Sequence, residues 1–277
     1  MAASSGTRPI PHRPVRGRAG TALAHPSVAG AVEALLESGP LHAFAAGHPE
    51  RRPLGGRGEA WRIPAPAPTE GTSGFWVVRH FERGGAVMRP LLGDRYLRLG
   101  PPRSFAELRV SETARARGVR TPRALAAGAY PAGPFRRADL VTDWLPDSVE
   151  LGTVLYGPQP PSASAGGSAA LLREAGALVR DLARAGVEHA DLNATNILVR
   201  DGKGARHLWV VDLDRARLHP EAVAGAGLRM LARLERSLAK LAAAANAAFT
   251  EADRETLRRG AGDLNDLIGL DLPRAAR

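Results

Sequence analysis

The residues best suited to chemistry lie between positions 189 and 214. Residues 189–196 read HADLNATN and precede an apolar stretch, and a second apolar stretch ends at Asp212, sixteen residues after Asn196. In phosphoryl transfer an Asp orients the acceptor hydroxyl and takes its proton, while an Asn and a later Asp hold Mg²⁺ ions that bridge the ATP phosphates. The spacing therefore predicts a kinase catalytic loop, with Asp191 as the base and Asn196 and Asp212 as Mg²⁺ ligands. The alternative is an Asx-rich turn. Two acidic elements in this order, each beside apolar sequence, favour the kinase.

A kinase also needs donors for the ATP phosphates. Gly56 and Gly58 lie just before a predicted strand, and glycines let backbone N–H groups approach phosphate oxygens closely. Protein kinases place a lysine on the third strand and pair it with a Glu on the next helix. This chain has no lysine before position 203, and Arg79 occupies the expected place. We expect Glu107 to be its partner, with Glu112 as the second choice.

Three further features of the sequence could support the site. His189 is expected to brace the loop by hydrogen bonding rather than to transfer a proton. Asp214 is either a further metal ligand or half of a salt bridge with Arg215 or Arg217. Residues 83–85 (RGG) either bind an anionic acceptor or form an ordinary turn.

The elements that must position these residues follow from hydrophobic periodicity and from turn residues. In the first part of the chain, strands are predicted at 59–63, 75–81, 122–129 and 138–145. Helices are predicted there at 28–38 and 103–118. The second part predicts helices around a small hairpin, at 169–185, 220–248 and beyond Thr250, with strands at 197–200 and 207–213. This order predicts an α+β, protein-kinase-like fold with two lobes. The lobes are expected at 28–146 and 147–277, after a flexible arm at 1–27.

The bulk properties narrow the class of protein. The 277 residues include no cysteine, which leaves no disulfide framework and no thiolate zinc site. No uncharged apolar run approaches the ~20 residues of a membrane span. The formal net charge of +10 favours anionic partners such as phospholipid headgroups. Aromatic residues make up only 5% and the arginines are spread along the chain, so no nucleic-acid partner is expected.

Several motifs together resemble the lipopolysaccharide kinase (Kdo/WaaP) family. They follow one another in the family's order over roughly residues 55–220, although the family usually has Gly at Ala190 and Phe at Leu213. The motifs lie at 56–58 with Trp61, 78–85, 93–96, 105–109, 118–123, 137–142, 189–198 and 211–215.

The resemblance implies ATP- and Mg²⁺-dependent phosphorylation of a 3-deoxy-D-manno-octulosonic acid (Kdo) sugar on a lipid A precursor. It also implies a Kdo-lipid A glycolipid as substrate and a peripheral location at the cytoplasmic face of the bacterial inner membrane. An arginine at the position of Arg79 fits the family's pattern. Two alternatives stay open: a soluble small-molecule kinase of the aminoglycoside or choline type, and a non-catalytic pseudokinase. Only the missing lysine supports the pseudokinase.

Overall fold

The protein is described by a computed structural model, which covers residues 11–55, 60–67, 69–82, 94–97, 100–158, 167–201, 206–220, 222 and 224–264. Contacts along the backbone divide the chain into two compact units. We call Ile10–Glu112 with Pro122–Leu145 the sheet unit, and Thr113–Thr121 with Pro146–Arg277 the helical unit. Each is described separately.

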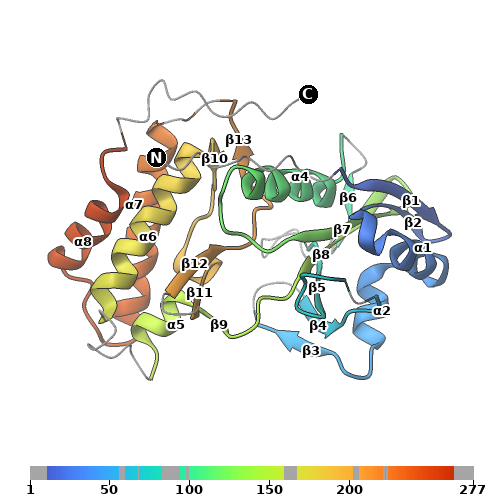
Figure 1. Cartoon of the computed structure of the whole chain (residues 1–277), viewed down its shortest axis with the longest axis horizontal. Coiled ribbons are helices and arrows are strands. Elements are labelled where there is room, and N and C mark those ends of the chain that lie inside the picture. Colours follow the sequence, from blue (N-terminus) through green and yellow to red (C-terminus); the bar gives the residue numbers. More distant parts are fainter. Residues whose placement is uncertain are drawn as a thin grey trace. The chain divides into compact units, whose positions relative to one another are not determined.

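The sheet unit is built on one antiparallel sheet (Figure 1). Its strands run in the order β1-β2-β7-β8-β5-β4-β3, and β6 also pairs with β8. The strands are β1 Arg13–Gly17, β2 Gly20–Ala24, β3 Arg52–Leu54, β4 Ala60–Pro64, β5 Phe75–His80, β6 Tyr96–Leu97, β7 Ala124–Ala132 and β8 Phe135–Asp143. The four strands predicted in this region are confirmed as β4, β5, β7 and β8, with ends shifted by a few residues.

The predicted flexible arm at residues 1–27 is wrong for the part that the structure describes. Strands β1 and β2 form a hairpin, and β2 continues into the sheet by pairing with β7. A 3-10 turn, Pro26–Val28, then leads into α1. The hairpin sequence is rich in Arg, Gly and Pro and has little strand propensity of its own. Its order depends on pairing with a strand more than a hundred residues away, which local sequence does not reveal.

Helices cover both faces of this sheet. Helices α1 (Ala29–Ser38) and α2 (Leu41–Gly47) pack with the buried side chains Trp76 and Val78 of β5. Helix α4 (Arg103–Ala116) packs Leu108 against Phe81 on the other face. Successive strand residues point to opposite faces. The alternation along β5 therefore directs Arg79 toward α4 and His80 toward α2. Helix α2 is not among the helices predicted from the sequence.

The helical unit carries α6 (Gly167–Arg184), α7 (Ala224–Ala244) and α8 (Glu251–Ala261), which pack side by side (Figure 1). Strand β9 (Ser148–Glu150) and the short helix α5 (Leu151–Tyr156) precede them in the chain. The predicted helices at 169–185 and 220–248 and beyond Thr250 are confirmed. No helix in the described segments is both long and apolar enough to cross a membrane.

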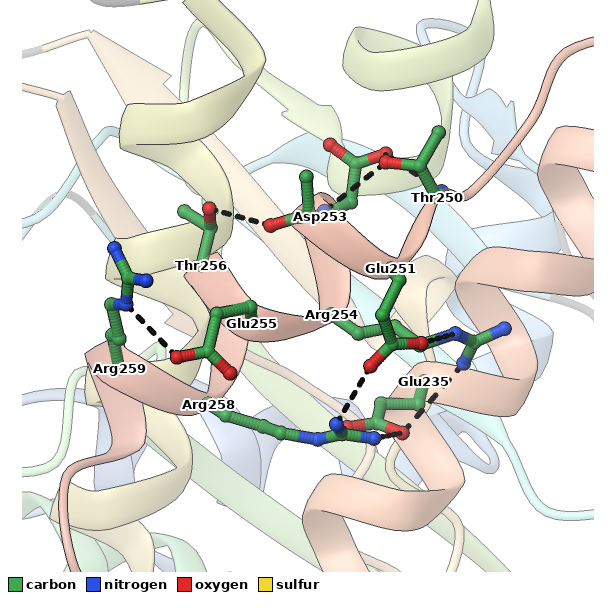
Figure 2. A network of polar contacts seen from close by, with 10 residues as sticks. Glu235, Thr250, Glu251, Asp253, Arg254, Glu255, Thr256, Arg258 and Arg259 are labelled. Atoms are coloured by element: carbon green, nitrogen blue, oxygen red, sulfur yellow. Dashed lines mark hydrogen bonds and ion pairs between the residues drawn. The ribbon is translucent and has the colours of Figure 1, made fainter.

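A capping box begins α8, and ion pairs connect this helix to α7. Its first turn has a capping box, in which Thr250 and Asp253 satisfy each other's backbone N–H groups. Glu235 of α7 forms ion pairs with Arg254 and Arg258 of α8 (Figure 2). The N–O distances are 3.7 Å to Arg254 and 2.9 Å to Arg258. Glu251 joins the same two arginines, which makes the contact a network rather than a single surface pair.

Candidate active site

The predicted catalytic loop begins at the end of a short strand in the helical unit. Strand β10 (Val187–Glu188) leads into it, a 3-10 turn at Ala194–Asn196 closes it, and β11 (Ile197–Asp201) follows. Strands β11 and β12 (Arg206–Val210) form the predicted hairpin (Figure 1). Gly186, two residues after the end of α6, has φ 65°, a left-handed conformation that favours glycine after a helix. The loop is therefore fixed at both ends by regular structure.

Hydrogen bonds within the loop fix its shape. Asn193 Oδ1 accepts from the backbone N–H groups of Thr195 and Asn196, at 2.9 and 3.0 Å. The side-chain amides of Asn193 and Asn196 both donate to the backbone oxygen of Asp191, each at 3.1 Å. These contacts use only the backbone of Asp191, whose side chain is exposed. Its carboxylate has no hydrogen-bond partner among the described residues, which leaves it available to an acceptor hydroxyl.

His189 braces the loop as predicted. Its side chain is 1% exposed, and Nδ1 accepts the backbone N–H of Asp191 at 3.2 Å. Nε2 lies 3.3 Å from the backbone oxygen of Val211 and is therefore the protonated nitrogen. Burial lowers the pKa of His189 and outweighs the opposing hydrogen bond to Val211 and the charges of the nearby aspartates. The ring is thus neutral, and it joins the loop to the strand end before Asp212.

The same strand end brings Asp212 close to Asn196. The N–H of Val211 donates to the backbone oxygen of Asn196 at 2.9 Å, so the next residue, Asp212, follows directly beside the loop. Asp212 is exposed and has φ 60°, a left-handed conformation that is uncommon for any residue except glycine. Strain of this kind collects at functional sites, where the surroundings hold it in place.

The donor set in this region suits Mg²⁺. The amide nitrogen of Asn196 is committed to Asp191, which leaves its oxygen as the atom that could bind a cation. Asp212 supplies a carboxylate from the neighbouring strand end. Among the described residues, no cluster of three acidic or His ligands could hold a metal ion by itself. Two oxygen ligands match Mg²⁺, which usually takes one or two protein ligands together with phosphate oxygens and water.

In the sheet unit, Arg79 is ion-paired with Glu107, the partner predicted for it. Glu107 is 2% exposed and lies on α4. The guanidinium of Arg79 also stacks over the ring of Phe81, 4.7 Å from its centroid. The second choice, Glu112, instead accepts the backbone N–H of Ala124 at 2.9 Å. A buried carboxylate and an aromatic ring therefore orient Arg79 from two sides.

Other predicted residues cannot be placed in the same way. Gly56, Gly58 and residues 83–85 lie outside the described residues. Asp214 is half-buried, and none of its described contacts decides between the two roles expected for it.

Sequence reasoning missed a buried polar network beside Arg79. Asp139 is 0% exposed and accepts from His80 Nδ1 at 2.6 Å and from the backbone N–H of His42 at 2.8 Å. The other ring nitrogen of His80 lies 3.1 Å from Asp94, which also binds Arg137 Nε at 2.6 Å. Burial alone would lower the pKa of His80, but hydrogen bonds and charge from both aspartates outweigh it and raise the pKa. Asp139 does not stand out in the sequence, because the same strand also carries Arg136, Arg137 and Asp143.

This network predicts a stability that depends on pH. The pKa of His80 is raised in the folded state. The charged ring therefore contributes fully to the free energy of unfolding below its unfolded-state pKa of about 6.5, and this contribution is lost as the pH rises through the folded-state pKa. His80→Gln should therefore lower the free energy of unfolding by about 1–2 kcal/mol at pH 6 and by less at pH 9. Urea unfolding at both pH values measures this.

Asp94 and Tyr130, two other ionisable groups of this network, do not predict the same trend. Arg137 pairs with Asp94, and the His42 ring of α2 lies 4.8 Å from the His80 ring. The pKa of Asp94 is lowered, so its contribution disappears only in acid, and burial raises that of Tyr130 well above its usual value. An equal loss of stability for His80→Gln at both pH values would contradict the charged imidazole.

These features are those of a phosphotransferase of the protein-kinase-like class, with the loop and the strand end in the helical unit and the Arg–Glu pair in the sheet unit. The fold agrees with a solved structure of WaaP in complex with acyl carrier protein, with a TM-score of 0.53 and 19% identity over 86% of this chain and 89% of that one. The chain belongs to the lipopolysaccharide kinase (Kdo/WaaP) family, whose model matches residues 57–260.

Two relatives of the chain share one description. A 3-deoxy-D-manno-octulosonic acid kinase from Stenotrophomonas maltophilia is 37% identical over 212 residues, which are 75% of this chain and 78% of the relative. A protein of the same description from Vibrio vulnificus is 34% identical over 187 residues, covering 67% of this chain and 71% of the relative.

Proposed function

We propose that the protein transfers the γ-phosphate of ATP to a hydroxyl of a Kdo sugar on a lipid A precursor, in lipopolysaccharide core biosynthesis. The observation that carries this proposal is 37% identity to Kdo kinases over three quarters of the chain. Residues 189–196 and Asp212 lie within that family match and retain the elements needed for phosphoryl transfer.

The loop geometry supports a role for Asp191 as the base. As the acceptor oxygen forms its bond to the γ-phosphorus, its proton passes to the Asp191 carboxylate, and the bond from phosphorus to the bridging oxygen of ADP breaks. The backbone of Asp191 is held by His189, Asn193 and Asn196, so the point from which its side chain projects is fixed before the acceptor arrives. Preorganisation of this kind supplies much of the rate in a reaction that depends mainly on positioning.

We assign Arg79 to the α- and β-phosphates, with Glu107 and Phe81 holding its guanidinium in place. A guanidinium keeps its charge at all physiological pH values and offers a planar pair of donors to phosphate oxygens. Gly56 and Gly58 are proposed to approach the same phosphates through backbone N–H groups. Asp191, Asn196 and Asp212 are all present, which argues against a pseudokinase. The absent lysine does not favour one either, because Arg79 can supply the same charge.

Asn196 and Asp212 are the residues proposed to hold Mg²⁺. The ion would neutralise charge on the phosphate oxygens during transfer. The high net positive charge and the glycolipid acceptor together support a peripheral location at the cytoplasmic face of the inner membrane.

The test is transfer of labelled phosphate from ATP, with Mg²⁺, to a Kdo-bearing lipid A precursor. The same precursor without Kdo, a panel of aminoglycosides and choline are assayed beside it. Labelling of the Kdo-bearing lipid alone is expected. Labelling of an aminoglycoside or choline would identify a soluble small-molecule kinase, and bound ATP with no transfer to any acceptor would favour a pseudokinase.

A further inference from the structure

Helix α7 carries a straight row of positive charge. Arg229, Arg233, Arg236 and Lys240 are all exposed, and they follow one another at intervals of four, three and four residues. Residues three and four apart lie on the same side of a helix. We call these four residues the α7 basic stripe.

The stripe borders the catalytic loop. The next face of α7 contacts the loop directly, because Ser237 Oγ accepts the N–H of Ala194 at 3.1 Å and Met230 Sδ lies 3.3 Å from the N–H of His189. Arg233 lies between these two contact residues along α7. On another side of α7, Glu235 pairs with Arg258 of α8 (Figure 2). The four stripe residues lie outside that contact and are exposed.

Most of this charge is not neutralised by the protein. Arg229 pairs with Glu188 at 2.8 Å, but in the described part of the chain no carboxylate forms an ion pair with Arg233, Arg236 or Lys240. Like charges that form no ion pair within the protein contribute little to the stability of the fold. Its natural counterpart is an anionic surface outside the molecule.

An apolar and basic strand continues the stripe at one end. Glu188 also accepts from His219 at 3.0 Å, so its carboxylate brings the end of β13 (Arg217–Leu218) close to Arg229. Strand β13 pairs with β10, which leads directly into the loop. Arg217 is exposed and Leu218 is 37% exposed. An exposed leucine between cations is typical of surfaces that contact lipid headgroups.

We propose that the α7 basic stripe, together with Arg217 and Leu218, docks the protein on the anionic headgroups of a lipid bilayer. This rests on the proposed function, because docking there presents a membrane-embedded acceptor to Asp191. The occupant is a lipid surface rather than nucleic acid, since the stripe has no aromatic side chain on which bases could stack.

The experiment measures sedimentation of the full chain with vesicles of phosphatidylcholine alone or with added phosphatidylglycerol. Neither ATP nor Kdo glycolipid is present, so a wrong kinase assignment would not affect the result. The variant R233Q/R236Q/K240Q is compared with R13Q/R16Q/R18Q, which removes the same charge from exposed residues of the sheet unit. A third variant, R233K/R236K, keeps the charge.

Each basic residue near an anionic surface contributes about a fivefold change in affinity. The stripe variant should therefore bind phosphatidylglycerol vesicles on the order of 100-fold more weakly, while the sheet-unit variant changes by less than about threefold and the lysine variant binds normally. Melting temperatures verify that each protein is folded. Equal losses in both glutamine variants, unchanged binding in the stripe variant, or tighter binding to single-stranded RNA than to vesicles would overturn the proposal.

Discussion

Asp191→Ala is expected to lower kcat for phosphate transfer by about a thousandfold, because general-base and positioning effects of this size are usual for a catalytic carboxylate. The loop itself should keep its shape. All the contacts that fix residue 191 use its backbone N–H and oxygen, which an alanine retains. The variant should therefore bind Mg·ATP nearly as well as the wild type, within about threefold.

Steady-state kinetics with the Kdo-bearing precursor and a thermal-shift titration with Mg·ATP separate these two effects. Asp212→Ala should show the opposite pattern, with weakened Mg·ATP binding, because we place Asp212 on the metal. Glu255→Ala is the matched control, since this exposed carboxylate lies on α8 and pairs only with Arg259 among the described residues. Near-normal turnover in Asp191→Ala would show that the base has been assigned to the wrong residue.

Gly260→Ala is expected to destabilise the helical unit by about 3 kcal/mol, at the upper end for overpacking, because the added methyl group meets backbone atoms. An ideal Cβ at Gly260 would lie 2.0 Å from the backbone oxygen of Arg173 on α6. Gly176 faces α8 in the same way, and its Cβ would lie 2.0 Å from the backbone oxygen of Leu257. Backbone atoms cannot rotate aside as a side chain does, so α6 and α8 would have to separate and lose their close packing.

Chemical denaturation of Gly176→Ala and Gly260→Ala measures this loss, and both variants should be affected. Gly30→Ala in α1 is the control. Gly30 is exposed and a Cβ there would meet nothing within 4 Å, so the better helix propensity of alanine should stabilise the protein by up to about 1 kcal/mol. If Gly260→Ala also stabilises, the close approach of α6 and α8 does not exist in solution.

Several local features could be read directly from the sequence. Thr250 and Asp253 of the capping box are three positions apart, and the left-handed Gly186 lies two residues after the end of α6. The expected bracing role of His189 is fulfilled by a hydrogen bond to the residue two positions later. Interactions over such short separations are fixed by local geometry and by residue type, and both are visible in the sequence.

Features that join distant segments were not visible. Asp139 and His80 are 59 residues apart, and Ala194 and Ser237 are 43 apart. The hairpin of β1 and β2 was taken for a flexible arm, because its order comes from pairing with β7. The close contact of α6 and α8 depends on two glycines whose partners are backbone atoms, which no periodicity reveals.

The sequence by itself indicated the class of reaction, phosphate transfer by a kinase, because Asp191, Asn196 and Asp212, which point to it, lie on one short loop and its hairpin. It also supplied the partner of Arg79, since the order of strand and helix in a kinase-like lobe brings the two together. Only the tertiary structure decided which carboxylates enclose His80 and which face of α7 is exposed beside the loop. Register between strands and the contact faces of helices result from packing of the whole unit, and no local pattern specifies them.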